Sequence, residues 1–253
     1  MGNLNLVSFI FLVVLFVLMP RAALRSARQL RQAHADGQMP PRQRLLLSTL
    51  FSLAVVGSLA AINARALGLN LFSLGGAGVR EIGIGAIAFS VLLLAIPIAR
   101  ARRSPEEERR RLIYSLAPRT QREWMLFSLV AVLAGLAEEA AYRGVAVWIL
   151  TPIFGSMLPA VFLAAMAFAV AHAVQGARTM VMVFVIALIF HLLVWLTHTL
   201  VIAMVVHTIY DLVAGYAAAK RARELQVPGP PAATPAATPA ATPAAAPASA
   251  PAH

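Results

Sequence analysis

The sequence has no cysteine and very little charge for its length. Without cysteine there is no disulfide, no thiolate metal ligand and no cysteine nucleophile. Charged residues make up 12% of the 253-residue chain and apolar residues 60%, whereas soluble domains average about 25% and about 45–50%. This balance excludes a soluble globular enzyme and a disordered chain. It also predicts that nucleic acid is not a partner, although the net charge is +11.

Long stretches without charge predict membrane-spanning helices, since a helix needs about 20 mostly apolar residues to cross a bilayer core. The predicted spans are Met1–Pro20, Leu45–Ala64, Ile82–Ala99, Trp124–Leu150, Met157–Val174 and two more within Thr179–Ala219. The first is interpreted as a retained helix rather than a signal peptide, because its arginines follow the apolar run. The predicted fold is therefore all-α, a polytopic transmembrane bundle of about seven spans, within a range of about six to eight.

Basic residues between alternate spans predict the orientation, because cytoplasmic loops collect Lys and Arg. Arg21–Arg44 contains six Arg and one Asp, and Arg100–Glu123 contains eight Arg and four Glu. Three more basic residues follow the last span, within residues 220–223. We therefore predict a multi-pass protein of the cell membrane with its N-terminus outside and its C-terminus in the cytoplasm.

The C-terminal end has a different composition from the rest of the chain. Residues 228–253 contain 12 Ala and 8 of the 16 Pro, including three successive PAAT repeats. Proline at every fourth residue blocks a helix, and alanine offers too little surface to build a core. We expect residues 220–253 to form a disordered cytoplasmic tail.

Ionisable residues inside the predicted spans mark a candidate site, because such groups are costly in hydrocarbon and usually functional. They lie in three motifs, which are EEAAYRG at Glu138–Gly144, FAVAH at Phe168–His172 and HTIYD at His207–Asp211. Glu139 and Arg143 are four residues apart with the acid first, which is the favourable order for an ion pair on a helix. Glu138 points about 100° away and has no obvious partner on its own helix.

The other two motifs supply imidazoles. His207 and Asp211 are again four residues apart, so Asp211 can orient or polarise His207, and Phe168 can pack beside His172. Counting about 1.5 Å per residue from the ends of the spans places Glu138, His172 and His207 within about a dozen Å of one another in depth.

A carboxylate with two imidazoles suits amide hydrolysis. The carboxylate and one histidine hold and deprotonate a water, while the other histidine, with Asp211, donates to the oxyanion. The same trio, Glu138, His172 and His207, suits a zinc ion with one open position, so a divalent metal such as zinc stays open as a cofactor. The sequence has no G-x-S-x-G and no H-E-x-x-H motif, so the serine-hydrolase and zincin alternatives lack support.

In this order, the three motifs resemble those of the CPBP family (CAAX proteases and bacteriocin-processing proteins, also called Abi). This family includes the type II CAAX prenyl endopeptidases, which are intramembrane proteases. Its patterns are E-E-x-x-x-R, F-x-x-x-H and H-x-x-x-N/D, and the resemblance covers about residues 119–215 of this chain. The last position is Asn in many members and Asp211 here.

The resemblance also implies roles for the individual residues. Glu138 would be the catalytic carboxylate that activates water, and His172 would share that water. His207 and Asp211 would line the oxyanion side, while Glu139 and Arg143 would support the site. The family has been described both as metal-dependent and as a glutamate-type protease without metal, and the sequence leaves both open.

Three regions are predicted: an N-terminal transmembrane region at 1–118, a CPBP-like protease core at 119–219 and the tail. The expected function is endopeptidase cleavage of a peptide or protein in or at the lipid bilayer, of the CAAX type or of the bacteriocin or signal-peptide type. The oligomeric state is left open. The alternative is a non-enzymatic membrane protein, such as a proton-coupled transporter or an immunity or scaffold factor. Against a transporter, the first half has no broken helices that match the charged second half.

Overall fold

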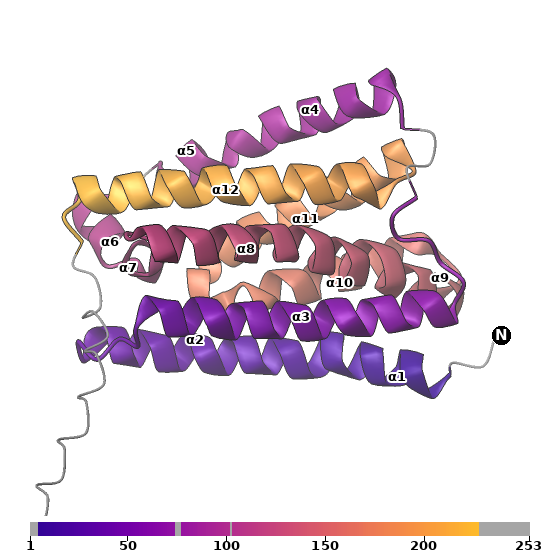
Figure 1. Cartoon of the computed structure of the whole chain (residues 1–253), viewed down its shortest axis with the longest axis horizontal. Helices are drawn as coiled ribbons and strands as arrows, with labels where there is room; N and C mark the ends of the chain where they lie inside the picture. The colour runs from indigo at the N-terminus through magenta and orange to yellow at the C-terminus, as the bar shows by residue number, and fades with distance from the viewer. Residues whose placement is uncertain (1–4, 74–76, 102, 228–253) are drawn as a thin grey trace, which may run out of the picture.

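The computed structural model describes residues 5–73, 77–101 and 103–227, and these form a bundle of helices without any strand (Figure 1). The first half contains α1 (Leu6–Val13), η1 (Val14–Leu18), α2 (Met19–Ala35), α3 (Arg42–Ala66), α4 (Val79–Leu93), α5 (Ala95–Arg100), α6 (Pro105–Arg109) and α7 (Leu112–Leu116). The second half contains α8 (Gln121–Glu138), η2 (Glu139–Ala146), α9 (Val147–Phe154), α10 (Met157–Ala171), η3 (Ala173–Gln175), α11 (Ala177–Thr197) and α12 (Leu200–Glu224). Most of the predicted tail, residues 228–253, lies outside the described residues.

Within the part of the chain that the structure describes, six helical segments are long and apolar enough to cross a membrane, so this is a multi-pass membrane protein. They are Leu6–Ala35, Arg42–Ala66, Val79–Ile98, Gln121–Phe154, Ala177–Thr197 and Leu200–Glu224. The predicted span Met157–Val174 corresponds to α10, which is apolar but only 15 residues long. It covers about 23 Å of a bilayer core about 30 Å thick. It is short because the chain leaves helical geometry at His172, one of the predicted site residues.

The first and the last helices continue beyond the predicted C-terminal ends of their spans. Pro20 does not end the first helix. It is the second residue of α2, just after the π-helix η1, where a missing backbone N–H is tolerated, and the helix runs on to Ala35. The last helix, α12, continues through the predicted tail boundary at residue 220 and ends at Glu224. Its final turns are therefore ordered, and the described chain reaches Val227.

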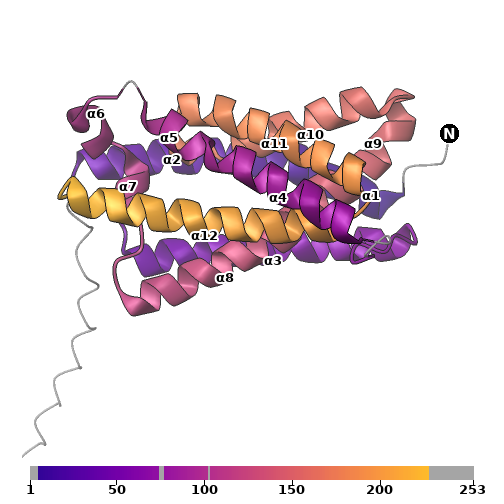
Figure 2. The same cartoon turned by 90° about the horizontal axis from the view of Figure 1, so that it is seen from above.

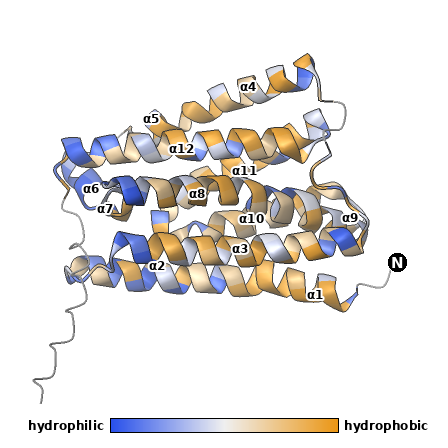
Figure 3. Cartoon of the chain, viewed as in Figure 1, coloured by the Kyte–Doolittle hydropathy of each residue, from blue (hydrophilic) through white to orange (hydrophobic). Residues whose placement is uncertain are grey.

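Hydrophilic residues gather at one end of the bundle, on the left in Figure 3. At this end α2 finishes, α3 and α8 begin, α6 and α7 lie, and α12 finishes, as both views show (Figures 1 and 2). The two segments predicted to be cytoplasmic, Arg21–Arg44 and Arg100–Glu123, therefore lie on the same side of the bundle. Which side of the membrane this is stays a prediction.

The loop between α5 and α8 folds onto the end of α12 rather than extending into solvent. Glu108 is buried and accepts hydrogen bonds from Arg221 Nε at 2.7 Å and from the Tyr114 hydroxyl at 3.2 Å. Val227 is also buried and accepts a hydrogen bond from Arg119 through its backbone carbonyl. These contacts fasten the end of the last helix to the loop.

Small residues bring α8 close to its neighbours just before the first motif. A Cβ atom added at Gly135 would lie 2.8 Å from the carbonyl oxygen of Met204 in α12. A Cβ added at Gly57 of α3 would lie 3.1 Å from the Cβ of Ala137. Small residues permit such close backbone approach between membrane helices. The approach at Gly135 places the end of α8 directly against the part of α12 that carries His207.

Candidate active site

The first motif lies where α8 changes into the π-helix η2, which begins at Glu139 and contains Arg143. Single π-turns inside helices occur frequently at functional sites. The predicted pair is present, since Arg143 Nη1 lies 3.2 Å from Glu139 Oε1 and both side chains have an exposed fraction of 0%. Glu138 precedes the π-helix and has an exposed fraction of 16%. The two adjacent glutamates therefore differ in environment, with Glu139 sealed inside the bundle and Glu138 at the edge of the site.

His207 of α12 contacts carboxylates from both sides. Its Nδ1 lies 2.7 Å from Glu139 Oε1, and because a carboxylate only accepts, Nδ1 carries the proton that is donated. Its Nε2 lies 3.7 Å from Glu138 Oε2 and 3.6 Å from Asp211 Oδ2, both longer than a hydrogen bond. Glu139 is therefore the direct partner of His207, and the predicted influence of Asp211 acts at a longer distance. The Glu139–His207 hydrogen bond joins two helices, so the spacing of residues within either motif could not predict it.

His172 sits at the end of α10, just before η3. Its Nδ1 lies 2.8 Å from the carbonyl oxygen of Phe168, and since a carbonyl only accepts, the neutral ring has its proton on Nδ1. Nε2 is then left with a free lone pair that can accept a proton. The Phe168 ring lies 4.5 Å from the imidazole, between ring centroids, which agrees with the predicted packing of this pair. In the described part of the chain no hydrogen bond joins His172 to Glu138.

Aromatic rings surround the buried part of the site. The Phe168 ring centroid lies 4.2 Å from Arg143 Cζ and 5.2 Å from the Tyr142 ring. Phe190 of α11 contributes a second ring, 5.3 Å from Arg143 Cζ and 5.2 Å from the His207 ring. Phe190 belongs to none of the three motifs, and nothing in the sequence distinguished it from the other apolar residues of its span.

Charge and exposure divide the site into two layers. Glu139 and Arg143 form the buried layer, together with His207, which is 5% exposed. Glu138 and Asp211 form the accessible layer, with side chains 16% and 33% exposed, and His172 is also partly exposed. The accessible layer is therefore the part of the site that is open at the surface of the bundle.

The predicted zinc ligands do not converge on one point. Over the described residues, no group of three or more His, Asp or Glu side chains is arranged to hold a metal ion. A catalytic zinc ion needs three protein ligands around one point, and the 3.7 Å between His207 Nε2 and Glu138 Oε2 brings together only two of the predicted set. Glu138, His172 and His207 are therefore not gathered around one metal position in the described structure.

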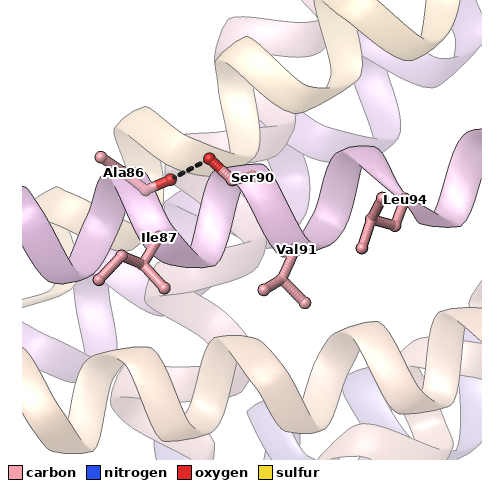
Figure 4. A pocket seen from close by; sticks show the side chains of 5 residues that line it. All are labelled: Ala86, Ile87, Ser90, Val91 and Leu94. Carbon is pink, nitrogen blue, oxygen red and sulfur yellow. Dashed lines mark hydrogen bonds between the residues drawn. The ribbon is translucent and has the colours of Figure 1, made fainter.

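Two surface hollows lie away from these residues. One, about 490 Å³ in volume, follows the side of α4 on which Figure 4 shows Ile87, Val91 and Leu94. The hydroxyl group of Ser90, which lines this hollow, donates a hydrogen bond to the carbonyl oxygen of Ala86 in the same helix at 2.8 Å. The other, about 460 Å³, lies along Gln121–Val132 of α8. Both are mainly apolar and contain no residue of the three motifs, so neither is the candidate active site.

Comparison with protein families identifies the segment that carries the site. Residues 120–213 match the family model described as Rce1-like, type II CAAX prenyl endopeptidase Rce1-like. The match contains all three motifs, from Glu138 to Asp211, and this is a family of proteases. Comparisons with curated proteins and with solved structures gave no match. Residues 120–213 therefore form an Rce1-like domain of the CPBP, or CAAX protease, family.

Proposed function

We propose that this protein is an intramembrane endopeptidase that hydrolyses a peptide bond in a membrane-associated peptide or protein. The observation that carries the proposal is the different environment of the two adjacent glutamates. Glu139 is paired with both Arg143 and His207, whereas Glu138 is partly exposed and its nearest ion-pair partner in the described chain, His207 Nε2, is 3.7 Å away. A carboxylate that lies beside an imidazole and forms no ion pair with an arginine is suited to act as a base.

The proposed reaction begins with a water held between Glu138 and His172 Nε2. Glu138 takes one proton as the water oxygen attacks the substrate carbonyl carbon, which gives a tetrahedral intermediate with a negative oxygen. Collapse of the intermediate breaks the carbon–nitrogen bond, and the proton held by Glu138 passes to the leaving amine. The products are a carboxylic acid and an amine, and Glu138 returns to its starting state.

His207 and Asp211 are proposed to stabilise the oxyanion. Because His207 Nδ1–H is donated to Glu139, Nε2 donates to the oxyanion only when the ring carries both protons, and the Glu139 carboxylate then balances that charge. Asp211 lies 3.6 Å from the same Nε2, so it can orient the ring or, when protonated, donate a second hydrogen bond. Glu139 and Arg143 support this arrangement from the buried layer.

The substrate and its direction of approach form the second part of the proposal. Basic loops lie on one side of the bundle, and we propose that this side faces the cytoplasm, with the C-terminus there and the N-terminus outside. The family name points to peptides of the prenylated CAAX type, while bacteriocin-type and signal-peptide-type substrates suit the same membrane site. The compact cluster of ionisable residues supports an enzyme over a transporter, because a proton relay requires such groups along the whole pathway.

The test is cleavage of defined peptides by purified protein in detergent. One internally quenched peptide carries a prenylated CAAX end, and a second carries an apolar signal-peptide segment. We expect Glu138→Gln to lower the cleavage rate by about 10²–10⁴-fold, the usual contribution of a general base. Glu106→Gln is the matched control, since Glu106 is an exposed glutamate on α6. Unchanged cleavage by Glu138→Gln would show that another residue activates the water, and flux driven by a pH gradient without cleavage would favour the transporter.

A further inference from the structure

Phe190 contacts two of the three ionisable side chains of the buried layer, Arg143 and His207, although it lies outside all three motifs. It is 1% exposed and comes from α11, a helix that contributes no residue to the proposed chemistry. Its ring centroid lies 5.2 Å from the His207 ring and 5.3 Å from Arg143 Cζ. No other aromatic ring among the described residues comes this close to the His207 imidazole, since Phe168 lies 6.2 Å away.

The buried guanidinium of Arg143 is stabilised by aromatic rings, because it has few polar partners. Its side chain is completely buried, and none of its three guanidinium nitrogens makes a hydrogen bond of good geometry within the described chain. Its ionic contact is with one oxygen of Glu139, at 3.2 Å. A guanidinium within about 6 Å of an aromatic centroid is attracted to the ring, most strongly where water is excluded. Phe168 and Phe190 both meet this condition.

The same oxygen of Glu139 also accepts a hydrogen bond from His207. Arg143 Nη1 lies 3.2 Å and His207 Nδ1 2.7 Å from Glu139 Oε1, so the three side chains form a continuous chain of contacts. Phe190 touches the first and the last members of this chain. Its ring is tilted by 42° to the imidazole, so the imidazole cannot turn freely without meeting it. Loss of the ring frees His207 to turn Nδ1 away from Glu139 and Nε2 away from Glu138 and Asp211.

We propose that Phe190 is a positioning residue of the proteolytic site. Its ring holds Arg143 and His207 on the shared oxygen of Glu139, and thereby aims His207 Nε2 at the accessible layer. This inference rests on the proposed function, because only oxyanion stabilisation gives the direction of Nε2 a role in the reaction. Small displacements of a reacting group matter, since a misplacement of about 1 Å can cost about 10²-fold in rate.

Core packing is the competing explanation for this residue. Phe190 also belongs to an apolar cluster with Leu92, Ile186, Leu193, Ala203 and Val206. Packing depends on volume and can be largely satisfied by an aliphatic side chain, whereas holding a guanidinium and an imidazole requires an aromatic face. The two roles therefore predict different results for Phe190→Leu and Phe190→Tyr.

The experiment compares these two variants with Phe11→Leu, the same change at a position on α1 that is also 1% exposed. The measurements are the melting temperature in detergent, and kcat and KM for one cleaved peptide. We expect Phe190→Leu to lower kcat about 10–10²-fold with little change in KM, and to melt no lower than Phe11→Leu. Phe190→Tyr should keep kcat within a few-fold of the original protein. Equal kcat losses in Phe190→Leu and Phe11→Leu would overturn the proposal, as would full kcat in Phe190→Leu.

A second readout does not depend on proteolysis. In protein labelled with ¹⁵N-histidine, the signal of His207 is assigned by its loss in His207→Gln. We expect Phe190→Leu to shift or broaden this signal and Phe11→Leu to leave it unchanged; an identical His207 signal in Phe190→Leu would overturn the positioning role. If the His207 signal responds as expected but Glu138→Gln cleaves normally, the proposed function fails while the contact of Phe190 with His207 stands.

Discussion

Glu139 and Glu138 should respond in opposite ways to the same substitution by glutamine. Glutamine keeps nearly the volume of glutamate and its carbonyl still accepts a hydrogen bond from His207 Nδ1, so the change removes charge without opening a cavity. At Glu139 it leaves the guanidinium of Arg143 buried without a counter-ion, because both side chains are fully enclosed and 3.2 Å apart. At Glu138 it removes a charge that forms no ion pair with an arginine in the described chain and lies 3.7 Å from His207.

The magnitude follows from the geometry of the pair. Opposite unit charges 3.2 Å apart attract by about 5 kcal/mol at an effective dielectric constant of about 20. Breaking a buried pair by removing one partner costs about 3–5 kcal/mol, against a total stability of about 5–15 kcal/mol for a typical protein. Glu139→Gln should therefore strongly reduce the amount of folded protein. Glu138→Gln should leave the free energy of unfolding unchanged or slightly increased, since that carboxylate is unfavourable in hydrocarbon.

A charge-matched double variant provides the control. Arg143→Met should destabilise the protein like Glu139→Gln, because it leaves Glu139 buried without its cation. Combining the two changes removes both charges and should recover much of the lost stability, as replacing a whole buried pair is often neutral. The assay is melting temperature and monodisperse yield in detergent, with cleavage measured per amount of folded protein.

The expected pattern separates the scaffold from the chemistry. Glu138→Gln should show normal yield and a cleavage rate lowered by about 10²–10⁴-fold, while Glu139→Gln should show low yield. A Glu139→Gln protein that melts like the original would refute the ion-pair argument. Equal losses of yield at both positions, or a double variant no more stable than either single one, would refute it as well.

Three further predictions concern topology, the tail and metal. Reporter fusions at Gln38 and Ser104 should both read as cytoplasmic, and an external reading at either would reverse the proposed orientation. Truncation after Val227 should leave insertion and activity intact, because Pro-Ala-Thr repeats bury little surface; truncation after Leu225 should lower the yield, since it removes the buried Val227 whose carbonyl binds Arg119. A strong chelator should leave cleavage largely unchanged, and loss of activity restored by Zn²⁺ would show that the ligands rearrange around a metal.

The sequence alone determined the features that depend on local composition and on spacing within one helix. Hydrophobicity is a local property, so the six long spans and the additional apolar helix α10 could be predicted, although the ends of the spans could not. The Glu139–Arg143 pair was also predictable, because residues four apart meet on a helix, and they still meet in the π-helix. The three motifs in order were enough to identify the protease family of residues 120–213.

Only the tertiary structure decided which side chains meet between helices. Spacing pairs His207 with Asp211 on α12, but the direct partner of His207 is Glu139, because the close approach of α8 and α12 at Gly135 brings the two together. The difference in exposure between the two glutamates also depends on the packing of the helices, because neighbouring residues cover Glu139 completely and leave Glu138 partly exposed. Phe190 shows most clearly what the sequence alone could not predict. Along the chain it is one apolar residue among many, and its contact with His207 exists only because α11 packs against α12.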